Sequence, residues 1–263
     1  MVDNLAMRMV DNLAMQAAKR IARHVPGLRK LYHFARRAYA NYKRQRSTVQ
    51  EVFTDIYEHN RWGSIASVSG TGSAPDQTGA IVRALPVMLR ELGVSTLLDI
   101  PCGDFHWMRA VDLNGINYVG GDIVPGLVQR NDEAYGRRGL AFRHLDLITD
   151  ELPNVDMILC RDGLVHLSYA HIFSAFANMC QSGSKYVLTT TFCGHQDNYD
   201  IATGDWRPLN LERPPFRLPK PLRLLNEGCT EADGAYQDKS LGLWDIRDVS
   251  RILSGSSGEP DES

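Results

Sequence analysis

Acidic residues stand at the ends of four apolar segments in this chain of 263 residues, at Asp99, Asp122, Asp146 and Asp162. Each segment has the length and apolar composition of a buried strand. Ligands of open α/β sheets bind outside the carboxyl ends of the strands, so these carboxylates are expected at one edge of a sheet. A single strand-end aspartate is equally typical of a helix N-cap. The four together predict a nucleotide-type ligand, because a carboxylate can accept hydrogen bonds from two ribose hydroxyls.

The loop after the first of these strands distinguishes between nucleotide ligands. The nicotinamide fingerprint G-x-G-x-x-G needs glycines where the backbone approaches a pyrophosphate. Residues 101–106 (PCGDFH) contain a single glycine, Gly103, which counts against NAD. Asp122 follows Asp99 by 23 positions, a spacing that suits an acidic group at the ribose hydroxyls.

A regular alternation of strands and helices positions these residues. Strands are predicted over 95–100, 117–121, 140–145, 156–160 and 185–192, and helices over 50–59, 75–92, 105–111, 125–135 and 170–180. Strands that alternate with helices of about ten residues indicate an α/β layered domain with a largely parallel sheet. Two further strands, 222–227 and 240–246, have no room for a crossover helix between them and are expected to pair antiparallel.

Two polar segments lie close to this framework. Residues 63–73 are rich in glycine and serine and are interpreted as a linker or a loop that grips a ligand. Residues 193–221 are polar and rich in proline, and a compact domain rarely carries such a stretch without a use. The longer segment is therefore predicted to be an active-site lid or acceptor loop.

Composition excludes several classes of protein. With 43% hydrophobic residues the chain can bury a large core, and its longest apolar runs fall far short of the roughly 20 residues of a membrane span. The five cysteines are odd in number and form no CxxC pair, so neither a zinc knuckle nor a disulfide framework is expected. A reducing, cytoplasmic location fits this cysteine pattern best.

Charge is distributed unevenly along the chain. Residues 1–50 carry a net charge of +9 and the rest −11, within a total of −2. Residues 1–60 are predicted to form a basic, amphipathic helical arm. Such an arm suits docking on the body or on a second copy of the chain, or peripheral contact with an anionic membrane. Nucleic acid is not expected as a partner, because the body is acidic.

Four segments together resemble a known family. LLDIPCGDFHWM (97–108), YVGGDIV (118–124), HLD (144–146) and DMILCRDGLVHL (156–167) are similar to the successive motifs of class I S-adenosylmethionine-dependent methyltransferases. The resemblance covers about residues 95–246. It implies a Rossmann-like α/β fold whose seven-stranded, mostly parallel sheet has an antiparallel last strand, with additional N-terminal helices. The methyltransferase domain would span 61–253, followed by a disordered tail over 254–263.

The resemblance also implies a set of cofactor contacts for S-adenosylmethionine. The loop from Asp99 to Gly103 would cradle the methionine part, Asp122 the ribose hydroxyls, and Asp146 the adenine. One departure is notable, since Pro101 and Phe105 occupy two positions where the family's loop D-x-G-x-G-x-G has glycine. The complete expected set is Asp99, Pro101, Cys102, Gly103, Asp122, Ile123, Asp146, Leu147, Arg161 and Ser73.

A histidine follows the fourth strand, where the similar phenolic O-methyltransferases carry a catalytic histidine. His166 is therefore the first candidate for a general base, which commonly contributes about 10²- to 10⁴-fold in rate. Asp162, four residues earlier, is expected to orient its imidazole or to hold a divalent cation. His195 in the acceptor loop and His144 near Asp146 are the other candidates. His166 could equally be a histidine that packs beneath the cofactor.

The acceptor loop suggests a class of substrate. Tyr199, Asp205, Trp206 and Arg207 combine planar polar groups with aromatic rings, a mixture that suits sugar hydroxyls and ring faces, whereas a flat apolar acceptor would need a more apolar pocket. TTTF (189–192), TGDWRPLNL (203–211) and DKSLGLW (238–244) resemble the sugar O-methyltransferases of methylmannose polysaccharide biosynthesis. A magnesium ion is a further expectation, held by the carboxylates Asp162, Asp197, Asp200 and Asp205.

The resemblance thus implies an O-methyltransferase that acts on a sugar or oligosaccharide hydroxyl. Three alternatives remain open from the residues alone. The first is an N- or small-molecule methyltransferase of the same fold, for which no general base would be essential. The second is a homologue that binds the cofactor without catalysis, as the altered glycine loop suggests. The third, methylation of nucleic acid, is opposed by the acidic body.

Overall fold

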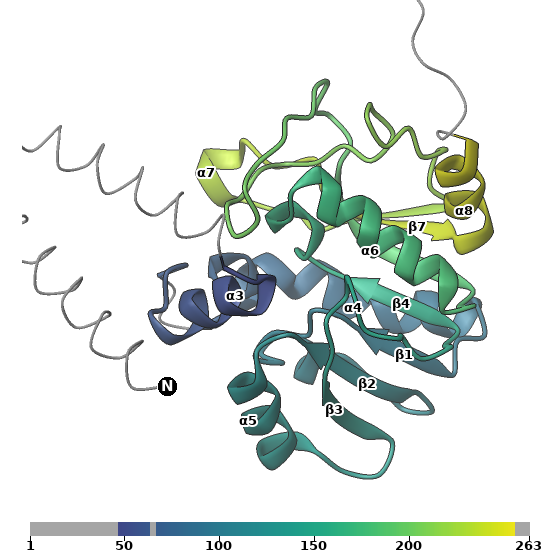
Figure 1. Ribbon diagram of the computed structural model, residues 1–263. Helices are drawn as coiled ribbons and strands as arrows, with labels where there is room; N and C mark the ends of the chain where they lie inside the picture. Colours follow the sequence, from purple (N-terminus) through teal and green to yellow (C-terminus); the bar gives the residue numbers. More distant parts are fainter. Residues whose placement is uncertain (1–46, 64–66, 256–263) are drawn as a thin grey trace, which may run out of the picture. The chain divides into compact units, whose positions relative to one another are not determined.

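The computed structural model describes residues 47–63 and 67–255 (Figure 1). The chain divides into two units, Met1–Thr48 and Val49–Ser263, and the second unit is described here. The basic arm expected over residues 1–60 lies outside the described residues up to position 46. From Val49 onward the chain belongs to the same unit as the sheet, so the helix at 49–58 is part of the body.

The second unit is built on a seven-stranded sheet with the order β3-β2-β1-β4-β5-β7-β6 (Figure 1). Strands β1 to β5 run parallel, while β7 is antiparallel to both β5 and β6. The strands are β1 Thr96–Asp99, β2 Asn117–Asp122, β3 Leu140–His144, β4 Met157–Cys160, β5 Tyr186–Phe192, β6 Arg223–Asn226 and β7 Lys239–Asp245.

This strand order confirms the predicted fold. The sheet is mostly parallel, its last strand is antiparallel, and the two late segments pair with each other as expected. The order reverses between β1 and β4, and that switch point is where open α/β sheets bind their ligands. The architecture is therefore the Rossmann-like arrangement of the class I methyltransferase fold.

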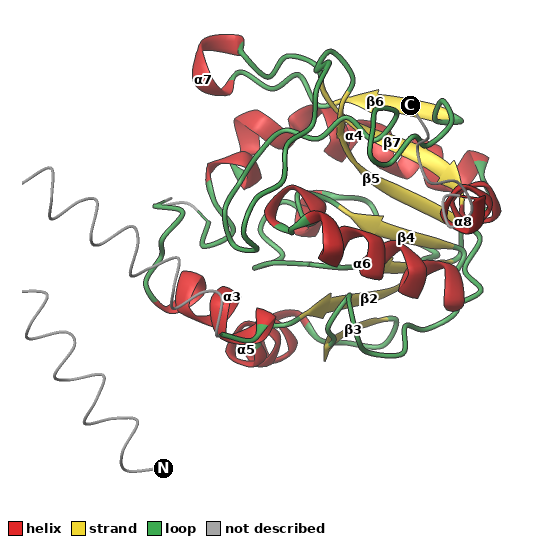
Figure 2. Ribbon diagram, turned by 45° about the horizontal axis from the view of Figure 1, so that its top comes forward, coloured by secondary structure: helices red, strands yellow, loops and turns green. Residues whose placement is uncertain are grey.

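Helices cover both faces of the sheet (Figure 2). One core packs α6 and α8 against strand residues such as Leu98 and Ile158, and the other packs α4 and α5 against residues such as Leu97 and Leu159. Successive strand residues are apolar on both faces because both faces are buried. The helices are α3 Val49–Glu58, α4 Pro75–Glu91, α5 Pro125–Tyr135, α6 Tyr169–Gln181, α7 Glu231–Gly234 and α8 Ile246–Gly255, with 3-10 turns Thr71–Ser73, Met108–Ala110 and Leu164–His166.

The structure corrects two element assignments. The helix predicted over 105–111 is only the 3-10 turn Met108–Ala110. Phe105 has φ +57° and is buried against Tyr118 and Phe142, so the chain turns inward where a helix would begin. At the other end, Ile246 begins helix α8 instead of ending a strand, and this helix extends to Gly255, into the segment expected to be a disordered tail.

Residues 193–221 pack as part of the body. Leu209, Leu211 and Phe216 belong to the hydrophobic core, and Phe192 donates its N–H to the carbonyl of Leu209 at 2.7 Å. Burial of these apolar residues anchors this part of the predicted lid or acceptor loop along β5.

Candidate functional site

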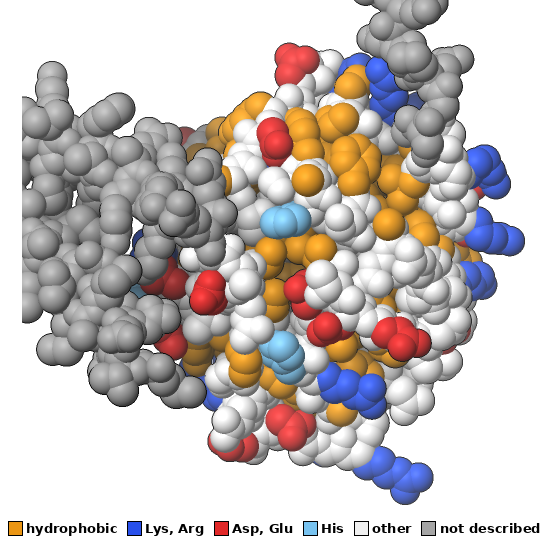
Figure 3. Space-filling model, viewed as in Figure 1, with side chains coloured by type: hydrophobic (Ala, Val, Ile, Leu, Met, Phe, Trp, Pro, Cys, Tyr) orange, Lys and Arg blue, Asp and Glu red, His pale blue; other side chains and the backbone are white. Residues whose placement is uncertain are grey.

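A pocket of about 1030 Å³, measured out to its open mouth, lies at the carboxyl ends of β1, β2 and β4. The loops after these strands form one side, and helix α3 with Trp62, Val68, Ser69 and Ser73 forms the other. Hydrophobic side chains gather on this face of the molecule between two histidines (Figure 3). The position matches the edge at which the sequence predicts a ligand.

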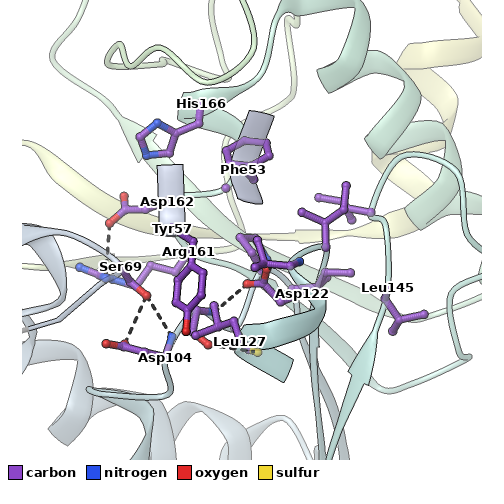
Figure 4. A pocket seen from close by; sticks show the side chains of 18 of the residues that line it. Phe53, Tyr57, Ser69, Asp104, Asp122, Leu127, Leu145, Arg161, Asp162 and His166 are labelled. Carbon is purple, nitrogen blue, oxygen red and sulfur yellow. Dashed lines mark hydrogen bonds and ion pairs between the residues drawn. The ribbon is translucent and has the colours of Figure 1, made fainter. Parts of the chain in front are cut away.

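Asp122 occupies the end of β2 and faces the pocket (Figure 4). Its two carboxylate oxygens accept the backbone N–H groups of Gly103 at 3.1 Å and Val124 at 3.0 Å. Each oxygen keeps a further lone pair, so the carboxylate can still accept from two hydroxyls. Burial raises the pKa of Asp122 to about 6, although the backbone N–H groups oppose this shift. The side chain is thus mostly ionised at neutral pH.

Gly103 is required where the first loop meets residues 67–69. It has φ +55°, and a Cβ built there would lie 2.2 Å from the Ser69 hydroxyl oxygen. That hydroxyl accepts the N–H of Asp104 at 3.0 Å and donates to its carboxylate at 3.2 Å (Figure 4). Ser67 and the N–H of Val68 also donate to Asp104, both at 3.0 Å. Val68, Ser69 and Ser73 of the glycine- and serine-rich segment therefore line the pocket.

Asp99 lies beneath this loop and does not line the pocket. It is 2% exposed and accepts the Tyr118 hydroxyl at 2.6 Å. Burial raises the pKa of Asp99 to about 7, even though the Tyr118 hydrogen bond lowers it. The expected cofactor-binding role of Asp99 is thus at most indirect, through support of the loop above it.

An apolar side of the pocket lies beyond Asp122. Ile123, Leu127 and Leu147 line it, together with Asp146 at the turn after β3. The Asp146 carboxylate accepts the N–H of Ile148 at 2.8 Å and the Thr149 hydroxyl, which holds the turn in place. This side offers the apolar contact that a flat heterocycle requires.

A buried cluster of charges forms the floor after β4. Arg161 pairs with Glu227 at 2.6 Å, Lys239 pairs with Asp162 at 2.7 Å, and Arg161 also donates to the carbonyl of Gly72 at 2.7 Å. Burial would raise the pKa of Asp162, but the charges of Lys239 and Arg161 outweigh it and lower the pKa. The cluster balances two cations with two anions and joins the sheet to the turn at Thr71–Ser73.

His166 ends the 3-10 turn after β4 and lines the pocket. Its Nδ1 lies 2.8 Å from the carbonyl oxygen of Asp205, and a carbonyl can only accept, so we assign the proton to Nδ1. Burial lowers the pKa of the imidazole below its usual value. The ring is therefore neutral at pH 7, and Nε2 keeps its lone pair. Since the Asp205 carbonyl orients the ring, the expectation that Asp162 does so is wrong.

Arg207 holds the turn that carries His166. Its guanidinium is fully buried and donates to the carbonyls of Val165 at 2.9 Å and Leu167 at 2.8 Å, with a longer bond to Leu164. The backbone N–H of Gly204 donates to the carbonyl of His166 at 2.8 Å. Arg207 does not line the pocket, so its structural position does not match the expected substrate contact.

Replacement of Arg207 by alanine is expected to lower the free energy of unfolding by about 3 to 5 kcal/mol, because it removes charged donors from several buried carbonyls. Arg207→Lys keeps the charge but not the fork of donors and should lose about half as much. Urea denaturation measures both variants. A loss below about 1 kcal/mol for Arg207→Ala would show that the turn does not depend on this side chain.

The structure brings most of the expected site residues together. Eleven of them line the pocket: Ser73, Pro101, Cys102, Gly103, Asp122, Ile123, Asp146, Leu147, Arg161, Asp162 and His166. Tyr199, Asp205 and Trp206 do not line it, and neither do His144 and His195. His195 pairs with Asp238 at 3.0 Å, and the Nε2 of His144 lies 3.1 Å from the carbonyl of Ile123.

The expected magnesium site does not form. Within residues 47–63 and 67–255, no group of three or more His, Cys, Asp or Glu side chains could hold a metal ion. The Asp162 carboxylate forms an ion pair with Lys239, and the Asp200 carboxylate accepts the backbone N–H groups of Tyr169 and Ile201. Asp162 and Asp200 therefore serve the local structure.

The sequence analysis missed the wall formed by α3 and the residue after it. Val49, Phe53 and Tyr57 line the pocket at a spacing of four, while Val52 and Ile56 are buried. Trp62 completes the wall and lies against His166, with 4.8 Å between the ring centres. The helix thus carries two apolar stripes, one buried in the core and one facing the pocket. The second stripe was the sequence signal that this helix also lines a binding site.

No known family model and no curated protein sequence matches the chain. Parts of it are similar to solved methyltransferase structures. Human N-acetylserotonin methyltransferase in complex with S-adenosylmethionine shares 13% identity, with 75% of this chain and 59% of that chain covered and a TM-score of 0.49. Magnesium protoporphyrin IX methyltransferase from Synechocystis PCC 6803, with bound S-adenosylhomocysteine, shares 17% identity, with 42% and 54% covered and a TM-score of 0.36.

An S-adenosylmethionine-dependent methyltransferase from Clostridium acetobutylicum ATCC 824 shares 14% identity, with 46% of this chain and 56% of that chain covered and a TM-score of 0.37. The chain thus spans a little over half the length of each of these three proteins. The assignment of the fold rests on the strand order of the sheet. Among the helices that the structure describes, none is long and apolar enough to cross a membrane.

Proposed function

We propose that the protein is an S-adenosylmethionine-dependent O-methyltransferase that uses His166 as a general base. The observation that carries this proposal is the arrangement of Asp122 and His166 in one pocket at the switch point of the sheet. Asp122 is a carboxylate with free lone pairs, suited to a diol, and His166 is a neutral imidazole with Nε2 available.

The chemistry of the lining residues fits the cofactor. Asp122 would hold the ribose hydroxyls, the side lined by Leu127 and Leu147 would hold the adenine, and the loop at Gly103 would hold the methionine part. When bound, the cofactor supplies an electrophilic methyl group on a positively charged sulfur and is left as a neutral thioether. The carboxylates of Asp104 and Asp122 on this side favour a ligand that carries positive charge.

His166 would accept the proton of the acceptor hydroxyl at Nε2 while the oxygen forms its new bond to carbon. The Asp205 carbonyl then stabilises the imidazolium through Nδ1–H. Trp62 lies against the ring and Arg207 holds its turn, so the imidazole keeps one orientation. Positioning of this kind accounts for much of the rate enhancement in displacement reactions. The entropy cost of bringing the reacting groups together is met on binding and no longer adds to the barrier.

A sugar or oligosaccharide acceptor, including a methylmannose polysaccharide precursor, follows from the sequence resemblance. The residues behind that substrate class were Tyr199, Asp205, Trp206 and Arg207, and they do not line the pocket. The sugar hypothesis therefore rests on the motifs of 189–244 alone. A cytoplasmic enzyme with membrane or subunit contacts through the basic arm is likewise a proposal, based on the charge of residues 1–50.

Isothermal titration of S-adenosylhomocysteine into the purified full chain tests the cofactor assignment. Binding in the micromolar range is expected, with NAD giving no heat in the same buffer. The cofactor product is the better probe because it binds without reacting. Binding of NAD instead, or no binding of either ligand, would contradict the methyltransferase proposal.

A further inference from the structure

The wall of the pocket opposite the strand ends is aromatic. Val49, Phe53 and Tyr57 present one stripe of α3 to the pocket, and Trp62 lies beside Phe53 (Figure 4 shows Phe53, Tyr57 and His166 among the lining residues). The ring centres of Phe53 and Trp62 are 6.5 Å apart, and those of Trp62 and His166 are 4.8 Å apart with planes tilted by 31°. An acceptor that reaches Nε2 of His166 would therefore lie beside aromatic side chains.

This wall offers few hydrogen-bonding groups. Among its four side chains, only the Tyr57 hydroxyl and the Trp62 indole N–H are polar. A sugar carries hydroxyls around its whole rim, and each one buried without a partner loses its hydrogen bonds to water. A flat ring loses little by the same burial and gains from contact with the aromatic faces.

The charges near the wall are already balanced. Arg161 and Lys239 are paired with Glu227 and Asp162, so the cluster leaves no net charge for an ionic substrate. Asp104, on the neighbouring loop, adds a negative charge to the lining. An acceptor that carries a phosphate or carboxylate would be repelled there. The pocket thus disfavours an anionic acceptor.

We propose that the acceptor is a neutral, flat aromatic ring that carries a hydroxyl group, stacked against Phe53 and Trp62 with the hydroxyl directed to Nε2 of His166. This inference rests on the proposed function and names its substrate class. It replaces the sugar acceptor with a phenolic one, on the evidence of the wall formed by Val49, Phe53, Tyr57 and Trp62.

The state of His166 agrees with a phenolic acceptor. Burial lowers the pKa of its imidazole, which makes it a weak base. A phenol has a pKa of about 10, as in tyrosine, and an aliphatic hydroxyl is a much weaker acid. Proton transfer to a weak base is therefore more favourable from the phenol.

The test uses the complex of the full chain with S-adenosylhomocysteine. Three probes are titrated into it: 2-naphthol, 2-naphthoic acid, which has the same rings with a negative charge, and methyl α-mannoside. Binding of 2-naphthol is expected to be at least about tenfold tighter than that of either other probe. Turnover with S-adenosylmethionine, measured as formation of S-adenosylhomocysteine, is expected with 2-naphthol and not with the mannoside.

Two tryptophan variants locate the acceptor. Trp62→Ala is expected to weaken binding of 2-naphthol about tenfold, and Trp62→Phe should restore most of it, while both bind S-adenosylhomocysteine as the parent does. Trp206→Ala tests the acceptor loop instead, because Trp206 is 39% exposed and does not line the pocket. Leu224→Ala, at an exposed position on β6, is the matched control for surface substitution.

Several results would overturn the inference. These are tighter binding or methylation of the mannoside, equal binding of 2-naphthoic acid, no binding of 2-naphthol, or a loss of binding in Trp206→Ala but not in Trp62→Ala. Each of them leaves the methyltransferase proposal intact as long as S-adenosylhomocysteine binds. Failure of S-adenosylhomocysteine to bind contradicts the proposed function itself, so the two failures are distinguishable.

Discussion

Replacement of His166 by alanine is expected to lower kcat by about 10²- to 10⁴-fold, the usual contribution of a general base. The affinity for S-adenosylhomocysteine should stay within about twofold, since the cofactor contacts assigned above lie at Gly103, Asp122 and Leu147. Single-turnover methylation measures the first quantity and isothermal titration the second. A large loss of kcat without a loss of cofactor affinity is expected if His166 is the base. It is not expected if His166 is a packing residue.

The pH dependence adds a second criterion for His166. Its pKa lies below the usual value, because burial disfavours the charged imidazole. The base is therefore unprotonated at pH 7, and kcat should be flat there and fall only at acid pH. In His166→Ala the acid limb due to this group should disappear. His59→Ala, at a side chain that is 62% exposed, controls for loss of a histidine.

One outcome would assign the general base to a residue other than His166. If His195→Ala abolishes turnover while His166→Ala retains it, the proton is accepted near Asp238 and the pocket assignment fails. Equal kcat in His166→Ala and the parent would favour an N-methyltransferase, for which no base is essential. A drop in kcat with an equal loss of cofactor binding would indicate that His166 supports the pocket as a packing residue.

Replacement of Asp122 by alanine is expected to weaken the binding of S-adenosylhomocysteine by about 100-fold or more. Two charge-assisted hydrogen bonds to ribose hydroxyls would be lost, and each is worth about 1.5 to 3 kcal/mol. The same change frees the backbone N–H groups of Gly103 and Val124, so the loop loses its anchor as well. Isothermal titration measures the affinity, and thermal unfolding checks that the variant is folded.

The raised pKa of Asp122 gives this prediction a pH signature. With a pKa of about 6, about nine tenths of the side chain is protonated at pH 5, so the affinity should fall up to about tenfold between pH 7.5 and 5. Asp122→Asn should be weak throughout and lack that slope. Asp112→Asn, at a side chain that is 53% exposed, is the control and should keep the slope of the parent.

A loss of protein stability at low pH does not explain this fall in affinity. A carboxyl whose pKa is raised in the folded state holds a proton that the unfolded chain has lost, between its unfolded pKa near 4 and about 6. From Asp122 alone, the stability of the ligand-free protein therefore falls as the pH rises through that window. Affinity and stability should thus change in opposite directions, and an affinity that is constant from pH 5 to 7.5 would show that Asp122 does not accept from the ligand.

The sequence by itself determined the layered fold and one side of the pocket. Strands 95–100 and 117–121 were predictable from local apolar runs, and parallel strands bring their carboxyl ends to one edge. The loop at Gly103 and the carboxylate of Asp122 follow from that topology, because the loop follows the end of β1 and Asp122 ends β2. Strand-end positions are local features, so a linear pattern reports them.

Only the tertiary structure decided the opposite wall and the state of the base. Phe53 and Trp62 lie more than 100 residues from His166 in the chain, and no local periodicity shows that they meet. Arg207 looked like a substrate contact, yet its donors are used on the carbonyls around Val165. The Nδ1 proton of His166 likewise depends on a carbonyl 39 positions away. Such contacts form by burial and hydrogen bonding between distant segments, and these depend on how the whole chain packs.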